Sequence, residues 1–305
     1  MSEKKELAIV FGITANWSFA LANVLMGIKN HSPDLNSDFI VYHDNLSLKD
    51  QQLLNSILPC IFINYKFPVE TNDKKNLYLQ QFSLLSFSIY ECFNHLDSYN
   101  KVVWLDVDIL IQKDINELIK LVNADIGLIQ DTKKLITNFT EINEKIRKYN
   151  LESNFYCSGT VIFNDNLPER KKLTDWCYKK TLDLFEILKY PDQAILNLII
   201  QDFKLNVTEI NFRKFCCFPM DKKVKDAVIV HPAGQEKFWN YWDFKDWNQN
   251  YKNWLKMGGT PYNGKKIHYI TRQIRKFFPY CPDPIRQTRK FFKFLFLVST
   301  GRQNV

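Results

Sequence analysis

Short apolar runs alternate with longer segments of helical character along the first third of the chain. Residues 7–13 are apolar throughout, as expected of a strand buried on both faces of a sheet. The same kind of pattern predicts further strands at 38–43, 61–65 and 101–110, and helices at 19–29, 48–57 and 78–96. Alternating strands and helices are typical of an α/β fold, a mixed, mostly parallel sheet with helices on both faces.

The pattern is less regular after residue 114. It predicts strands at 124–130, 156–164 and 228–231, and helices at 175–188 and 193–202. Neither a repeat nor a low-complexity linker divides this region, so one domain over residues 1–264 is expected. The clearest boundary follows the glycines at 258, 259 and 264.

Composition excludes several classes of protein. Of the 305 residues 46% are apolar and 15% aromatic, which argues against intrinsic disorder. The longest apolar stretch, 291–298, contains Lys293 and is much shorter than the roughly 18 residues of a membrane span. A charged N-terminus unlike a secretory signal and seven irregularly spaced cysteines indicate a reducing cytoplasm.

The positive charge is concentrated at the C-terminus. Residues 265–305 contain ten basic residues and one acidic residue, a net charge of +9, which leaves −1 on residues 1–264 of the total of +8. The same segment is rich in aromatic residues, as expected of a tail lying on an anionic membrane. Nucleic acid is a less favoured partner, because the run FFKFLFLV is too apolar for a solvated arm. A terminal helix docked on the body is the third interpretation.

Two carboxylates end the predicted strand 101–110. Asp106 and Asp108 flank Val107, and in an extended strand they would share one face and converge on one cation. Carboxylates suit Mg²⁺ or Mn²⁺, which commonly bind together with nucleotide phosphates. A D-x-D triplet arises by chance about once in a chain of this composition, so its position after a buried strand carries the argument.

A second pattern, H-x-x-G-x-x-K, follows the predicted strand 228–231. His231 offers an imidazole ligand to a metal, Gly234 allows the backbone to approach a phosphate, and Lys237 supplies a cation. A single histidine after a strand is more often structural, but the combined pattern is expected in only about one chain in sixty of this composition.

Five segments in order resemble glycosyltransferase family 8: IVFGITANW, KVVWLDVDILIQKDI, YCSGTVIFN, YPDQAILN and HPAGQEKFW. The resemblance extends from residue 7 to about residue 240. Members have the GT-A nucleotide-sugar-binding fold and are retaining, metal-dependent enzymes that use mainly UDP-sugars. They include bacterial lipooligosaccharide galactosyl- and glucosyltransferases.

The resemblance implies specific roles for residues of this chain. Asp106, Asp108 and His231 would bind Mn²⁺, or alternatively Mg²⁺. Asp192 and Gln193 would lie beside the anomeric carbon, although Asp192 can equally be the N-cap of the helix predicted from 193. The UDP-sugar would be bound by Gly12, Thr14, Asn16, Trp17, Asp106, Val107, Asp131, Gly234 and Lys237.

The chain also departs from the family pattern. Thr14 replaces a frequent Asp at the base, Cys157 replaces an Asn at the donor sugar, and Ala194 replaces a second Asp. No Arg or Lys lies between residues 77 and 90, where many members have one. These departures leave the identity of the sugar open.

The expected protein is a cytoplasmic retaining hexosyltransferase, peripheral on the inner face of the plasma membrane. Its acceptor would be a bacterial surface glycan of the lipopolysaccharide, lipooligosaccharide or capsule type. One alternative is a catalytically degenerate module that binds a membrane surface or nucleic acid. Another is a nucleotidyltransferase, which would release pyrophosphate.

Overall fold

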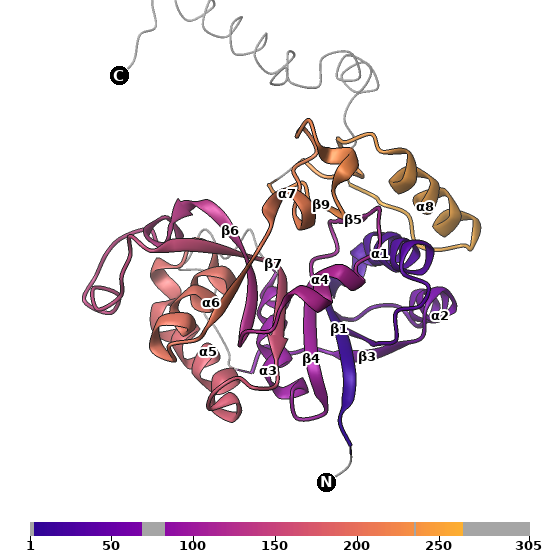
Figure 1. The fold of residues 1–305 in the computed structure, drawn as a ribbon. Coiled ribbons are helices and arrows are strands. Elements are labelled where there is room, and N and C mark those ends of the chain that lie inside the picture. The colour runs from indigo at the N-terminus through magenta and orange to yellow at the C-terminus, as the bar shows by residue number, and fades with distance from the viewer. Residues whose placement is uncertain (1–2, 69–82, 235, 265–305) are drawn as a thin grey trace, which may run out of the picture.

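The computed structural model describes residues 3–68, 83–234 and 236–264 (Figure 1). Its centre is a seven-stranded sheet of order β3-β2-β1-β4-β7-β6-β8. The strands are β1 (Lys5–Thr14), β2 (Asp38–Asp44), β3 (Cys60–Asn64), β4 (Tyr99–Leu105), β6 (Ile126–Lys134), β7 (Asn154–Asn164) and β8 (Val207–Ile210). Only β7 runs antiparallel to its neighbours β4 and β6, so the predicted mixed, mostly parallel sheet is confirmed.

Helices cover both faces of the sheet (Figure 1). The α-helices are α1 (Ser18–His31), α2 (Leu48–Ile57), α3 (Cys92–His95), α4 (Asn116–Leu121), α5 (Arg170–Leu184), α6 (Pro191–Asp202), α7 (Phe212–Phe215) and α8 (Lys245–Lys256). The 3₁₀ helices are η1 (Ala15–Trp17), η4 (Leu84–Glu91), η5 (Leu135–Asn138), η6 (Phe185–Ile187) and η7 (Val224–Asp226). None of the helices in the described part of the chain combines the length and apolar character needed to span a membrane.

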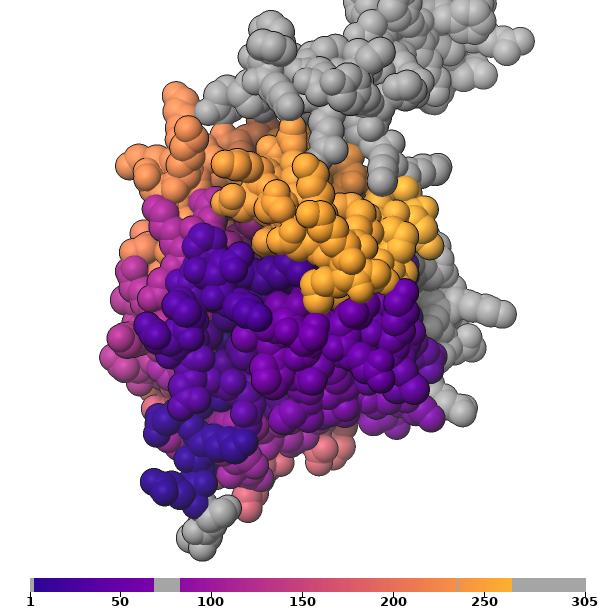
Figure 2. Space-filling view, turned by 90° about the vertical axis from the view of Figure 1, so that its right-hand side faces the viewer, coloured from indigo at the N-terminus to yellow at the C-terminus, as the bar shows by residue number. Residues whose placement is uncertain are grey.

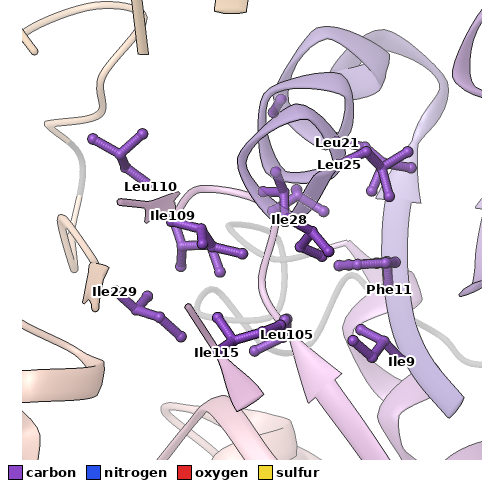
Figure 3. Packing of buried hydrophobic residues seen from close by; sticks show 14 of the residues in the cluster. Ile9, Phe11, Leu21, Leu25, Ile28, Leu105, Ile109, Leu110, Ile115 and Ile229 are labelled. Carbon is purple, nitrogen blue, oxygen red and sulfur yellow. The ribbon is translucent and has the colours of Figure 1, made fainter. Parts of the chain in front are cut away.

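The alternation of side chains along β1 divides the hydrophobic core in two. Ile9 and Phe11 pack with Leu21, Leu25 and Ile28 of α1 on one face of the sheet (Figure 3). Ala8 and Val10 belong to a second cluster, together with buried residues of η4, α3, α5 and α6 on the opposite face. Successive side chains of a strand point to opposite faces, so a strand that is apolar throughout needs a layer of helices on each side.

A small second sheet links the middle of the chain to its C-terminal part. Strand β5 (Leu110–Ile111) pairs antiparallel with β9 (Ile229–Val230). The chain then continues into α8, and the side-chain amide of Asn23 in α1 donates to the Trp247 carbonyl over 2.8 Å. The space-filling view shows this orange-to-yellow part lying against the N-terminal half (Figure 2). Residues after β9 are thereby held at the C-terminal ends of β1 and β4.

Several predicted elements need correction. The strand predicted at 101–110 is broken, because β4 ends at Leu105 and the chain bends before β5 begins. Leaving the sheet keeps two carboxylates out of a layer that is buried on both faces. The helix predicted at 78–96 is 3₁₀ over η4 and α-helical only in α3, and residues 78–82 lie outside the described part. The helix predicted at 175–188 begins earlier, at Arg170, ends at Leu184 and continues as η6.

The helix predicted from 193 begins at Pro191, with Tyr190 as its N-cap, so Asp192 lies in its first turn and is not the cap. The pattern did not predict α4, β8, α7 or α8. The basic tail at 265–305, and with it the domain boundary after residue 264, falls outside the described residues.

Candidate active site

Three candidate metal ligands from distant parts of the sequence lie together at the end of β4. Asp106 and Asp108 stand in the bend after β4, and His231 follows β9. The His231 Nε2 atom is 3.2 Å from Asp108 Oδ1 and 3.9 Å from Asp106 Oδ2. One ligand atom from each residue can be chosen so that all three lie within 4.8 Å of one another. The pairing of β5 with β9 therefore assembles this triad.

The donor atoms of the triad suit a divalent cation. Two carboxylates and one imidazole match the preferences of Mn²⁺ and similar ions. The Lys237 Nζ atom ion-pairs with Asp108 Oδ2 and donates to the Pro232 carbonyl over 3.0 Å. An ammonium group thus supplies part of the positive charge that two adjacent carboxylates require.

The charges of the triad shift one another's pKa values. Burial opposes ionisation of Asp108, but His231 and Lys237 outweigh it and hold the pKa of this carboxyl well below its ordinary value. Burial and the charge of Asp108 raise the pKa of Asp106. Burial alone would lower the pKa of His231, yet Asp108 raises it well above the usual range. Asp108 is therefore the negatively charged group with which His231 and Lys237 pair.

Asp106 is held by two neighbours. The Trp104 indole N–H donates to Asp106 Oδ1 over 3.1 Å, and the Asp106 N–H donates to the Gly159 carbonyl over 2.9 Å. A Cβ on Gly12 would lie 2.7 Å from Trp104 Cη2. Gly12, a predicted donor-binding residue, therefore makes room for the indole that orients Asp106.

Gly159 of β7 was not predicted as a site residue. A Cβ at this position would lie 2.5 Å from His231 Cε1 and 2.9 Å from Asp106 Oδ2. Only glycine leaves space for both side chains at this point. The signal available in the sequence was its place within the segment YCSGTVIFN.

The predicted catalytic pair, Asp192 and Gln193, lies next to Ser158 of β7. The Ser158 N–H donates to Gln193 Oε1 over 3.2 Å. Burial raises the pKa of Asp192 to about 6, although a hydrogen bond with the Ser158 side chain works in the opposite direction. The charge of Asp106 also contributes to the raised value. The first turn of α6 thus brings Asp192 and Gln193 to the same end of the sheet as the triad.

Asp131 projects from an irregular stretch of β6. The register between β6 and β7 shifts after Gln130, and Asp131 Oδ1 accepts hydrogen bonds from the N–H groups of Thr132 (2.6 Å) and Lys133 (3.3 Å). The Cys157 Sγ atom is 3.9 Å from Asp131 Oδ2. Because Cys157 is two residues from Gly159, Asp131 also belongs to this end of the sheet.

The remaining predicted donor residues follow β1 or β9. The Thr14 hydroxyl donates to Asn16 Oδ1 over 2.7 Å, and the Trp17 ring meets Trp239 edge to face at 5.1 Å. The contact between Trp17 and Trp239 links the residues that follow β1 to the segment that contains Lys237. Gly234 has φ +102°, and its missing Cβ faces open space.

Val107 differs from the other predicted donor residues. Its side chain is buried in the core on the α1 side of the sheet. The backbone of Val107 is therefore the part that remains for contact with a donor.

Comparison with known proteins identifies the family of the chain and its fold. Residues 8–243 match the family model for glycosyl transferase family 8. Among solved structures, the galactosyltransferase LgtC in complex with donor and acceptor sugar analogs has a TM-score of 0.62 and 18% identity, covering 82% of this chain and 99% of its own. The bifunctional glycosyltransferase WbbM has a TM-score of 0.60 and 15% identity, covering 86% of this chain and 52% of its own.

The glycosyltransferase GlyE of Streptococcus pneumoniae TIGR4 has a TM-score of 0.53 and 13% identity, covering 86% of this chain and 66% of its own. At these identities the likeness shows the fold. No sequence among the curated proteins matches the chain.

Proposed function

Because the chain belongs to glycosyltransferase family 8 and is a glycosyltransferase with the GT-A fold, we propose that it transfers a hexose from a UDP-sugar to a bacterial surface glycan or glycolipid. The transfer retains the configuration at the anomeric carbon. The observation that carries this proposal is the convergence of Asp106, Asp108 and His231 at the strand ends, with Asp192 and Gln193 beside them.

Asp106, Asp108 and His231 would hold the divalent cation, with Mn²⁺ as the first choice and Mg²⁺ as the alternative. When bound, such an ion neutralises charge on the donor diphosphate and so makes the nucleoside diphosphate a better leaving group. Lys237 provides a second positive charge beside Asp108 for the same diphosphate. The open space at Gly234 leaves room for a phosphate to approach the backbone.

Thr14, Asn16 and Trp17 would bind the nucleoside, with the half-buried Trp17 ring as the stacking surface for the base. Its edge-to-face contact with Trp239 supports the ring. Asp131 would accept hydrogen bonds from donor-sugar hydroxyls, since two backbone N–H groups already fix the direction of its carboxylate.

Asp192 and Gln193 would lie on either side of the reacting carbon. The Ser158 N–H holds the Gln193 side chain through Oε1, which leaves the amide N–H groups to meet the substrate. An ionised Asp192 would stabilise positive charge that develops on the sugar ring in the transition state. Its raised pKa makes its charge sensitive to pH near neutrality.

The catalytic unit in this proposal is residues 1–264, and the tail at 265–305 associates with the inner face of the plasma membrane. The support is the sequence of the tail, in which ten basic residues are mixed with aromatic ones. Each basic residue near an anionic surface contributes about 1 kcal/mol of binding. Replacing Arg286, Arg289, Lys290 and Lys293 by Gln should strongly reduce binding to phosphatidylserine vesicles.

A panel of nucleotide-sugars with Mn²⁺ tests the proposed activity of the full chain. The expected result is release of UDP from at least one UDP-sugar, lost in Asp108→Ala and kept in Asp175→Ala, which changes an exposed carboxylate of α5. Release of pyrophosphate would instead indicate a nucleotidyltransferase. No turnover of any donor, together with metal-independent binding to vesicles, would indicate a degenerate module.

A further inference from the structure

The His231 ring has a thiol on the side opposite the carboxylates. Cys216 follows α7 and is 4% exposed, and its Sγ atom lies 3.5 Å from His231 Nδ1. The other ring nitrogen, Nε2, faces Asp108 Oδ1 at 3.2 Å. The imidazole therefore lies between a sulfur atom and the carboxylate pair.

The backbone around Cys216 fixes this arrangement. The Cys217 N–H donates to the Ile229 carbonyl over 3.0 Å, and the His231 N–H donates to the Cys217 carbonyl over 2.9 Å. Residues 216–217 thus run beside β9 like a short added strand. The His231 ring also packs closely against Gly159, because a Cβ at that position would lie 2.5 Å from His231 Cε1. These contacts hold the Cys216 Sγ atom beside Nδ1 of His231.

A neutral histidine can bind a cation through Nε2 only if its proton is on Nδ1. That N–H then needs an acceptor, and metal-binding histidines usually have a carboxylate or carbonyl there. Sulfur is a weaker acceptor, but Cys216 occupies this position. On the basis of the proposed function, we propose that Cys216 is a positioning residue that accepts the Nδ1–H hydrogen bond and keeps Nε2 of His231 directed at the divalent cation.

The neighbouring Cys217 provides a control that distinguishes a positioning role of Cys216 from a role in packing alone. Cys217 is also fully buried, but its Sγ atom lies 3.7 Å from the Phe218 carbonyl and not at the imidazole. A buried cysteine that only fills space behaves as a small apolar residue, and changing either one would then have similar effects. A role through His231 instead predicts an effect on the metal at one position only.

Isothermal titration of the full chain with Mn²⁺, without donor, tests the role of Cys216. Cys216→Ala and Cys216→Val should bind Mn²⁺ about 10-fold more weakly than wild type. Cys216→Ser supplies a hydroxyl acceptor and should restore most of the affinity. Cys217→Ala should bind like wild type. In turnover assays the Cys216→Val variant should need more Mn²⁺ for half-maximal rate while reaching nearly the same rate at saturating metal.

Several outcomes would overturn the proposal. Equal Mn²⁺ affinity in Cys216→Val and Cys217→Ala removes the basis for a role through His231, and so does a wild-type protein that binds no divalent cation. Thermal unfolding identifies a variant that does not fold, and if Cys216→Ala is one, the Ser and Val variants decide. A wild type that binds Mn²⁺ in a Cys216-dependent manner but turns over no nucleotide-sugar would contradict the proposed function alone.

Discussion

Asp106 donates its backbone N–H to the carbonyl of Gly159, so β4 stays tied to β7 at the residue where it leaves the sheet. This bond places the Asp106 carboxylate against the Cα of Gly159, with the His231 ring on the same side. The candidate metal site is therefore sensitive to one methyl group on β7.

Gly159→Ala should displace His231 or Asp106 and weaken Mn²⁺ binding at least 10-fold. The reason is steric, since the new Cβ would lie 2.5 Å from His231 Cε1. Mn²⁺ titration measures the effect, with Thr160→Ala on the same strand as the control. An alanine variant that binds Mn²⁺ as tightly as the control would show that the ring adjusts without loss.

Lys237→Met should separate binding of the metal from binding of the diphosphate. Loss of the ammonium group removes a cation that now pairs with Asp108, so Mn²⁺ should bind at least as tightly as in wild type. Without that charge, turnover should fall by about 100-fold or more. Lys222→Met, at an exposed position, is the control. A parallel loss of metal affinity would contradict the predicted role.

Asp192 should make stability depend on pH. Its folded pKa of about 6 exceeds the ordinary value of 3.8, so the folded protein binds this proton more tightly than the unfolded chain does. Stability should therefore fall as the pH rises from about 4 through 6. Asp192→Asn removes this loss and should be about 1–2 kcal/mol more stable than wild type at pH 7.5, with no gain at pH 4. Urea unfolding of the metal-free protein at both pH values measures the difference, and an equal difference at both would contradict the assignment.

The same carboxyl should shape the pH profile of turnover. If the ionised form stabilises the transition state, the rate should rise between pH 5 and 7, through the pKa of about 6. Asp192→Asn should lower the rate about 100-fold or more and abolish this rise. A profile in the residual activity of the variant that still rises around pH 6 would assign the titration to another group.

Trp17→Ala should raise the KM for the nucleotide-sugar about 10-fold, because base stacking on an aromatic ring contributes about 1–3 kcal/mol. Affinity for Mn²⁺ in the absence of donor should stay the same, since the ring packs edge to face on Trp239, which is not a member of the triad. Trp17→Phe retains a stacking face and should recover most of the effect. An unchanged KM in Trp17→Ala would move the base-binding surface elsewhere.

Strands with continuous apolar runs, and one helix whose end is indicated by Pro59, could be predicted from the sequence. Helix α2 has the predicted limits, β1 is longer than predicted by two residues at its start and one at its end, and β2 is longer by one residue at its end. The break after Leu105 could not be seen, because apolar residues continue on both sides of the carboxylates. Strand β8, VTEI, lies at the sheet edge and is too short and polar to stand out. In α8 the buried residues Trp247, Asn250 and Trp254 are separated by charged and polar ones.

The residues of the candidate site likewise differ in whether the sequence predicts them. Asp106, Asp108 and His231 carry chemistry in their side chains, so their types and spacing are visible in the sequence. Gly159 contributes by leaving space for neighbouring side chains, and the role proposed for Cys216 is a contact with one ring nitrogen of His231. Such roles depend on contacts across the fold, which no local pattern records.

Completion of the site depends on the pairing of β5 with β9, which is more distant in sequence than any other strand pair in the described part of the chain. Ile111 and Ile229 are 118 residues apart in the sequence, compared with 30 for the paired residues of β1 and β2 and 94 for those of β1 and β4. During synthesis, a nascent chain that ends before residue 231 would carry both aspartates without their imidazole. Ion binding by the complete triad would therefore require that the C-terminal segment has emerged and docked.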